Sequence, residues 1–195
     1  MNIETAIIKA TKELKKSQNK SPGIDSEIIM SKVINKSREY VLLNSDKELN
    51  NENLDYFKKL VRVRSKGKPI AYLTGKKFFW KSEFIINKNA LIPRPDTEII
   101  IEMILKIFKN KDKLRFLDIG IGSGCIILSL LKEKKNFFGT GIDISNECVN
   151  LSKINALRLG VNNRARLIKS NVDNFNFGKY DLIISNPPYI NKLDL

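Results

Sequence analysis

The chain has 195 residues, of which 42% are hydrophobic and 29% charged, a composition typical of a globular protein with an ordered core. It contains no histidine, which excludes a Ser-His-Asp or Cys-His mechanism and a His-ligated zinc site, and we expect no bound metal. The net charge of +14 permits a nucleic-acid partner, but the lysines are scattered and favour a lysine-rich surface.

Targeting and redox signals are weak in this sequence. No apolar run is long enough to cross a bilayer, and the first residues have no basic region followed by an apolar stretch. Cys125 and Cys148 are too few for a disulfide scaffold, so we interpret both as free thiols. These features predict a cytoplasmic protein that does not use a membrane.

The first part of the chain predicts a small helical bundle, because apolar residues recur at helical spacing. Asp25 is expected to cap a second helix, and Ser45 with Glu48 has the spacing of a capping box. Another helix is predicted over 52–64. We therefore expect a helical domain over 1–66, in which no residue looks catalytic.

A linker is predicted over 67–92. Gly67-Lys68-Pro69 interrupts the helical pattern. The runs 77–80 and 83–86 are strand-like, and Lys81-Ser82 between them would form the turn of a β-hairpin.

A rigid connector follows over 91–98, because its two prolines fix the backbone. Thr97 is expected to cap an apolar helix over 98–108. Strands and helices then alternate. The predicted strands are 115–119, 136–142, 165–169 and 181–185, and the helices between them are 123–131 and 146–159. This alternation predicts an α/β fold with a doubly wound, Rossmann-like parallel sheet in a domain over 93–195.

A glycine-rich turn follows the first strand of this sheet and would let a ligand lie against the backbone. The dinucleotide fingerprint needs a third glycine or small residue at the place of Cys125, whereas the glycines here alternate. Alternating glycines after an acidic strand end are similar to the first motif of class I methyltransferases. Asp118 and nearby carbonyls suit the ammonium group of an amino acid. The residues expected to bind the cofactor here are Asp118, Gly120, Ile121, Gly122, Ser123 and Gly124.

Asp143 ends the second strand, where a carboxylate can accept both hydroxyl hydrogens of a ribose. The turn followed by Asp143 one β–α unit later predicts S-adenosylmethionine as the cofactor. The alternative is a tight structural turn in which Asp143 caps the next helix.

The tetrapeptide Asn186-Pro187-Pro188-Tyr189 follows the fourth strand, at the edge where doubly wound sheets bind ligands. The Asn186 side-chain oxygen and the Pro187 carbonyl can each accept an N–H hydrogen bond and so aim the lone pair of a planar nitrogen. Pro187 and Pro188 hold the turn extended, and Tyr189 offers a face for stacking. The tetrapeptide predicts methylation of an amide or amine nitrogen without a strong general base. The alternative is an ordinary turn after a strand.

The chain resembles the bacterial glutamine-N5 methyltransferases that modify peptide chain release factors. Four segments carry the resemblance: 67–75 with Phe78, the connector 92–98, the turn 120–124 with Asp143, and 186–189. The resemblance implies methylation of the glutamine in a Gly-Gly-Gln motif, with 186–189 catalytic and substrate-binding and Asn186 also touching the cofactor. It further implies that the helical domain holds the release factor, and that the enzyme is a monomer that needs no nucleic acid.

Three other functions remain open from the sequence. The same tetrapeptide occurs in enzymes that methylate amino groups of DNA or RNA bases, and a related branch methylates a ribosomal-protein glutamine. The third possibility is a binding module without activity.

Two features depart from the family pattern. Asn171 and Val172 stand where the family places an acidic and a bulky or aromatic residue against the adenine, with Asp173 as an alternative contact. The sequence ends at Leu195, after about four of the family's seven strands. We therefore expect an incomplete catalytic domain that binds cofactor weakly and lacks robust activity.

Overall fold

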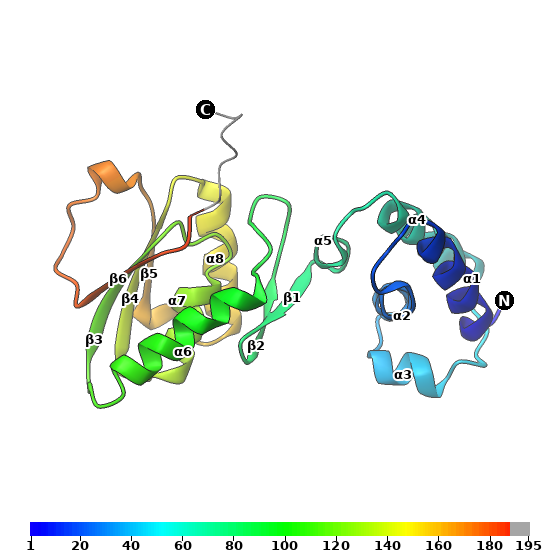
Figure 1. Cartoon of the computed structure of the whole chain (residues 1–195), viewed down its shortest axis with the longest axis horizontal. Helices are drawn as coiled ribbons and strands as arrows, with labels where there is room; N and C mark the ends of the chain where they lie inside the picture. The colour runs from blue at the N-terminus through cyan, green and yellow to red at the C-terminus, as the bar shows by residue number, and fades with distance from the viewer. Residues whose placement is uncertain (188–195) are drawn as a thin grey trace. The chain divides into compact units, whose positions relative to one another are not determined.

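The computed structural model describes residues 1–187 and divides the chain into two compact units (Figure 1). The first unit is Met1–Gly75, and the second begins at Lys76. The boundary falls inside the predicted linker 67–92. The linker contains a short helix before the boundary and a β-hairpin after it. No helix in residues 1–187 is long and apolar enough to span a membrane.

The first unit is a helical bundle, as predicted. Asn2, Ser37 and Asn50 precede three of its helices, and each side chain accepts a hydrogen bond from the backbone N–H three residues on. Buried side chains from different helices, including Leu14 and Phe57, form its core. The helices are α1 (Ile3–Lys16), α2 (Pro22–Val33), α3 (Arg38–Leu43), α4 (Asn51–Ser65) and α5 (Ile70–Thr74).

Both predicted caps in this unit are wrong. Asp25 lies inside the first turn of α2, where its buried carboxylate accepts hydrogen bonds from Arg64 and Asn19. A buried carboxylate gains more from a cation than from a helix amide. Ser45 and Glu48 precede no helix directly, and the Glu48 carboxylate instead pairs with the N-terminal ammonium group.

The Asp25–Arg64 ion pair joins α2 to α4, with Arg64 Nε 2.6 Å from Asp25 Oδ2. Arg64→Met would leave the Asp25 carboxylate buried without its cation. We expect the free energy of unfolding to fall by ~3 kcal/mol, measured by urea denaturation followed by circular dichroism. Arg62→Met, on the exposed side of the same helix, is the control and should change it by less than about 0.5 kcal/mol. Equal losses in both variants would contradict a stabilising role for the ion pair.

The second unit begins with an antiparallel hairpin of β1 (Lys76–Phe79) and β2 (Ser82–Ile85). Phe79 pairs with Ser82, so the turn is Trp80-Lys81, one residue earlier than predicted. Trp80 adopts a left-handed φ of 53°. Its backbone N–H donates to Glu98 and its indole N–H to Glu133, so contacts from later helices fix this turn.

A four-stranded parallel sheet follows within the described residues, which confirms the α/β fold predicted from alternation. Short 3₁₀ turns lie at Pro95–Thr97, Asn162–Arg164 and Val172–Asn174. The helices and strands are α6 (Glu98–Ile107), β3 (Leu114–Ile119), α7 (Cys125–Glu133), β4 (Phe137–Asp143), α8 (Asn146–Arg158), β5 (Ala165–Lys169) and β6 (Leu182–Ser185).

The strand order β5-β4-β3-β6 determines where a ligand can bind. The chain proceeds from β3 through β4 to β5 and then returns to the other side of β3 as β6. The order therefore reverses at β3, and the carboxyl ends of β3 and β6 form a topological switch point, where open α/β sheets bind ligands. Ile119 pairs with Ser185 at these ends, so the glycine-rich turn and Asn186 follow directly from paired residues.

Helix α7 and the turn before it pack closely on β4 because β4 carries two glycines. A Cβ atom on Gly139 would lie 2.7 Å from Cγ1 of Ile127. A Cβ atom on Gly141 would lie 2.6 Å from Cγ2 of Ile121, inside the glycine-rich turn. Non-bonded carbon atoms do not approach one another this closely. The two glycines therefore let the turn and α7 pack against the sheet.

Candidate cofactor and substrate site

Two adjoining cavities lie at the carboxyl ends of the strands. The first is bordered by the connector before α6 and by the start of α7. The second is bordered by the end of β4 and by the segment after β5. Both cavities are lined by Leu91, Gly120, Gly122 and Asn186. Together they form one elongated cleft along the glycine-rich turn.

The backbone of the turn faces this cleft. Gly120, Gly122 and Gly124 have φ values of 76°, 53° and 79°, a region that residues with side chains rarely adopt. A Cβ atom on Gly120 or Gly122 would meet nothing within 4 Å, so both glycines border open space. Ile121 and Ser123 between them are buried. An elongated ligand can therefore lie directly against the peptide groups.

Asp118 lies at the bottom of the first cavity and is 2% exposed. Its Oδ2 accepts the Ile127 N–H at 3.3 Å. Burial raises the pKa of the Asp118 carboxyl to about 7, and the nearby charge of Asp143 also raises it. A cationic group entering the cavity would favour the ionised form, so Asp118 suits an ammonium ligand.

Asp143 holds the turn to the end of β4. Its Oδ2 accepts the Gly122 N–H at 3.0 Å, and its Oδ1 accepts the Ser145 N–H at 2.9 Å. The N-cap of α8 is Ser145, whose side chain accepts from Cys148, so Asp143 is not the cap. Each Asp143 oxygen has a further lone pair for a hydroxyl donor in the second cavity, which it lines.

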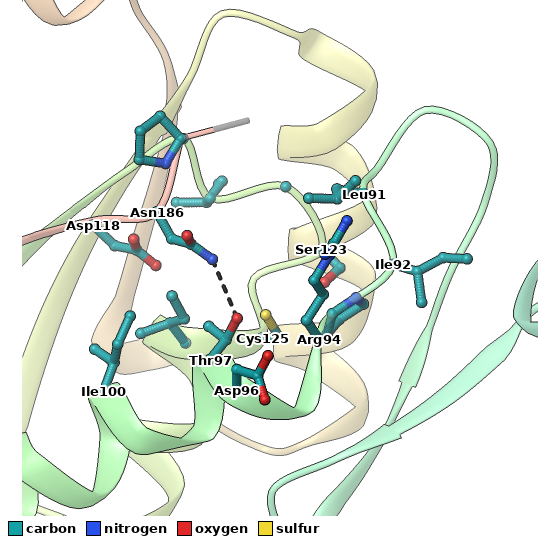
Figure 2. A pocket seen from close by; sticks show the side chains of 16 residues that line it. Leu91, Ile92, Arg94, Asp96, Thr97, Ile100, Asp118, Ser123, Cys125 and Asn186 are labelled. Atoms are coloured by element: carbon teal, nitrogen blue, oxygen red, sulfur yellow. Dashed lines mark hydrogen bonds between the residues drawn. The ribbon is translucent and has the colours of Figure 1, made fainter. Parts of the chain in front are cut away.

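Asn186 borders both cavities from the end of β6. Its Nδ2 donates to Thr97 Oγ1 at 3.3 Å (Figure 2). This hydrogen bond fixes the orientation of the amide group, and Oδ1 is the Asn186 side-chain atom that can accept a hydrogen from a substrate. Thr97 is 8% exposed and makes no capping bond, which corrects the predicted cap. It belongs to the 3₁₀ turn before α6 and has helical backbone angles, whereas an N-cap side chain needs an extended backbone.

The other predicted site residues lie in two places. Pro187 lines the first cavity beside Asn186. Pro188 and Tyr189 fall outside the described residues. Asn171 and Val172 both line the second cavity, whereas Asp173 does not. The Asn171 Oδ1 accepts the Asp173 N–H at 3.3 Å within the 3₁₀ turn after β5.

The connector, which was predicted to be rigid and carries part of the family resemblance, also supplies residues of the first cavity. Leu91, Ile92, Arg94 and Asp96 line the first cavity together with Thr97. The two prolines were the local signal that this segment has a fixed shape. Nothing in the local pattern indicated which side chains face a ligand.

Cys125 also lines the first cavity, but its thiol is not a nucleophile. Burial raises its pKa to about 12, and the charge of Asp118 adds to this. A thiol that stays protonated at neutral pH fits the free, unreactive cysteine expected at this position.

Family models match both parts of the chain. Residues 5–75 match the PrmC N-terminal domain, and residues 96–195 match the Methyltransferase small domain. Among solved structures, the delta-N METTL16 MTase domain aligns with 56% of this chain and 54% of its own, at 24% identity and a TM-score of 0.46.

Curated relatives align over nearly the whole chain. A release factor glutamine methyltransferase of Buchnera aphidicola (subspecies Schizaphis graminum) is 37% identical over 97% of this chain and 68% of its own length. A bifunctional methyltransferase of Rickettsia conorii is 37% identical over 97% of this chain but only 41% of its own length. The chain thus spans about two fifths of the Rickettsia protein. It belongs to the release factor glutamine methyltransferase family, as the resemblance of its motifs predicted.

The raised pKa of Asp118 predicts how stability depends on pH. Between the ordinary carboxyl pKa near 4 and about 7, the folded protein keeps a proton that the unfolded chain has released. The free energy of unfolding should therefore fall as pH rises through this window. Asp118→Asn removes this contribution. The free energy of unfolding of this variant, measured by urea denaturation, should therefore fall less between pH 5 and pH 8 than that of the wild type. Asp112→Asn, at an exposed position, should keep the wild-type dependence. The same dependence in all three proteins would contradict the assignment.

Proposed function

We propose that the chain transfers a methyl group from S-adenosylmethionine to the side-chain nitrogen of glutamine in the Gly-Gly-Gln motif of peptide chain release factors. The observation that carries the proposal is Asn186 at the switch point, with its amide nitrogen held by Thr97 and its oxygen available beside the glycine-rich turn. The names of the Buchnera relatives support the choice of substrate.

The residues that line the cleft suit the functional groups of S-adenosylmethionine. Asp118 in the first cavity suits the ammonium group of the methionine end, and Asp143 in the second suits the ribose hydroxyls. Asn171 and Val172 would contact the adenine. When bound, the cofactor supplies a methyl group on a sulfonium, which is already activated for transfer.

The protein groups then have to position a weak nucleophile. An amide nitrogen shares its lone pair with the adjoining carbonyl, so it attacks poorly unless it is held and pyramidalised. Asn186 Oδ1 and the Pro187 carbonyl would each accept one of its hydrogens, aim the lone pair and stabilise the positive charge that develops. The proton can leave after transfer, which is compatible with a chain that contains no histidine.

The remaining roles are also proposals. The helical domain predicted over 1–66 would hold the release factor, and 67–92 would link it to the catalytic domain. We also propose a monomer that requires no nucleic acid, as the resemblance to the family implies. Its site of action would be the cytoplasm, where translation terminates.

Transfer of a labelled methyl group tests the substrate. A full-length form of the protein is incubated with methyl-labelled S-adenosylmethionine and either a release factor or nucleic acid. We expect label on the release factor and none on a matched release factor in which the Gly-Gly-Gln glutamine is replaced by glutamate. Label on nucleic acid alone would favour a base amino-group methyltransferase, which the net charge of +14 makes the main competitor.

Replacing Asn186 should separate catalysis from cofactor binding. Asn186→Ala removes the acceptor for the substrate amide, so we expect methylation to fall by about 100-fold or more. The Kd for S-adenosylhomocysteine, measured by calorimetry, should change only slightly. Asp143→Ala should mainly weaken cofactor binding. A wild-type methylation rate in Asn186→Ala would disprove the amide-holding role.

Thr97 should act as a positioning residue through Asn186. Thr97→Val keeps the shape of the side chain but removes the hydrogen bond to Asn186 Nδ2, so kcat should fall by roughly tenfold. Thr97→Ser keeps a hydroxyl and should recover most of the rate. The Kd for S-adenosylhomocysteine should stay near the wild-type value in both. Equal kcat values for the valine and serine variants would show that the hydroxyl does not orient Asn186.

A further inference from the structure

Asn155 is a buried residue of α8 whose side-chain amide bonds to two separate parts of the second unit. The residue is 1% exposed. Its Oδ1 accepts the Ile85 N–H at 2.8 Å, and its Nδ2 donates to the Ile85 carbonyl at 3.0 Å. The same Nδ2 donates its other hydrogen to the Ser123 carbonyl at 2.9 Å. One side chain thus joins the end of β2 to the glycine-rich turn.

The hairpin is bonded to Asn155 at its open end, opposite the turn at Trp80-Lys81. Both main-chain polar groups of Ile85 bond to the side-chain amide, which takes the place that a residue of a third strand would have beside β2. Ile85 pairs across the hairpin with Lys76, which directly follows the last residue of the helical unit. Asn155 therefore acts on the hairpin at the end where the helical unit is attached.

The glycine-rich turn is held from α8 at two consecutive carbonyl groups. Ser152 lies one helical turn before Asn155, is fully buried and donates from its Oγ to the Gly122 carbonyl at 3.0 Å. Asn155 holds the next carbonyl, that of Ser123. A Cβ atom on Gly124 would lie 3.0 Å from the Ser152 Oγ, so the helix and the turn are in close contact. The turn can therefore move only if α8 moves with it or if these hydrogen bonds break.

Other hydrogen bonds hold the hairpin at its opposite end. The backbone N–H of Trp80 donates to Glu98, which begins α6, and its indole N–H donates to Glu133, which ends α7. These bonds end on helices, whereas those of Asn155 reach a carbonyl of the turn that borders the cleft. The open end of the hairpin is thus the part that is bonded directly to the cleft wall.

We infer that Asn155 is a positioning residue that couples the glycine-rich turn to the open end of the β1–β2 hairpin. A ligand that fixes the turn holds Asn155 through Ser123, and Asn155 then holds Ile85. The effect also runs in the other direction, because coupling between two positions is reciprocal. The helical unit is attached at this end, so a protein bound to that unit influences the cleft through the same contact. The inference rests on the proposed function, in which the ligand is S-adenosylmethionine.

Amide hydrogen exchange with and without S-adenosylhomocysteine tests this coupling in a full-length form of the protein. The Ile85 N–H is the probe, because Ile85 lines neither cavity and a ligand in the cleft would not touch it. With saturating S-adenosylhomocysteine, we expect exchange of this amide in the wild type to slow by about fivefold or more. The amides of the glycine-rich turn should slow as well, because the ligand lies against them.

Three variants of α8 separate Asn155 from the rest of the helix. Asn155→Ala removes the bonds to Ile85 and to the turn, so the ligand should no longer slow exchange at Ile85. Exchange in the turn should still slow, because Asp143 and Ser152 continue to hold Gly122. Ser152→Ala releases the Gly122 carbonyl alone and should keep the effect at Ile85. Asn150→Ala, at an exposed position of the same helix, is the matched control and should behave as the wild type.

The wild-type measurement decides the inference even if Asn155→Ala does not fold. A purely structural Asn155 would leave exchange at Ile85 independent of the ligand in the wild type, and that result would overturn the coupling. Full ligand-dependent slowing in a folded Asn155→Ala would overturn it as well. Absence of any slowing in the turn of the wild type would instead refute the proposed cofactor, so the two failures are distinguishable.

Discussion

The parallel pairing of β3 with β6 is the constraint on which the site depends. Ile119 and Ser185 are the last paired residues of these strands, so the glycine-rich turn and Asn186 emerge side by side. Without this pairing, the residues suited to bind a cofactor and the residue suited to hold a substrate amide would belong to separate surfaces. The two glycines of β4 complete the arrangement by letting the turn sit against the sheet.

The connector between the hairpin and α6 is the second structural determinant. Its prolines fix the backbone, so the side chains between and after them have defined directions. Thr97 is turned inward to Asn186, and Arg94 lines the first cavity. A segment outside the sheet therefore contributes both to the orientation of the amide and to the charge pattern of the cleft.

The chemistry proposed for the cleft relies on preorganised carboxylates and hydrogen-bond acceptors rather than on a general base. Asp118 is buried at a cost, which its raised pKa reflects, and Asp143 is held by two backbone N–H groups. Such preorganised groups suit a transfer in which the donor is already activated and the acceptor has only to be aimed. The absence of histidine from the sequence is compatible with this.

The sequence by itself determined the features that depend on neighbouring residues: the parallel strands, the glycine-rich turn and the placement of Asp143 and Asn186 at strand ends. Periodicity and glycine spacing are local signals, and they predicted the α/β fold and the strand ends at which the cleft lies. They did not indicate which side chains of the connector line it. Tertiary structure alone decided the partners of Asp25 and Thr97. Asp25 pairs with a residue 39 positions away and Thr97 with one 89 positions away. A side chain that can cap a helix can equally bond a distant group, and only the packing of the elements decides between them.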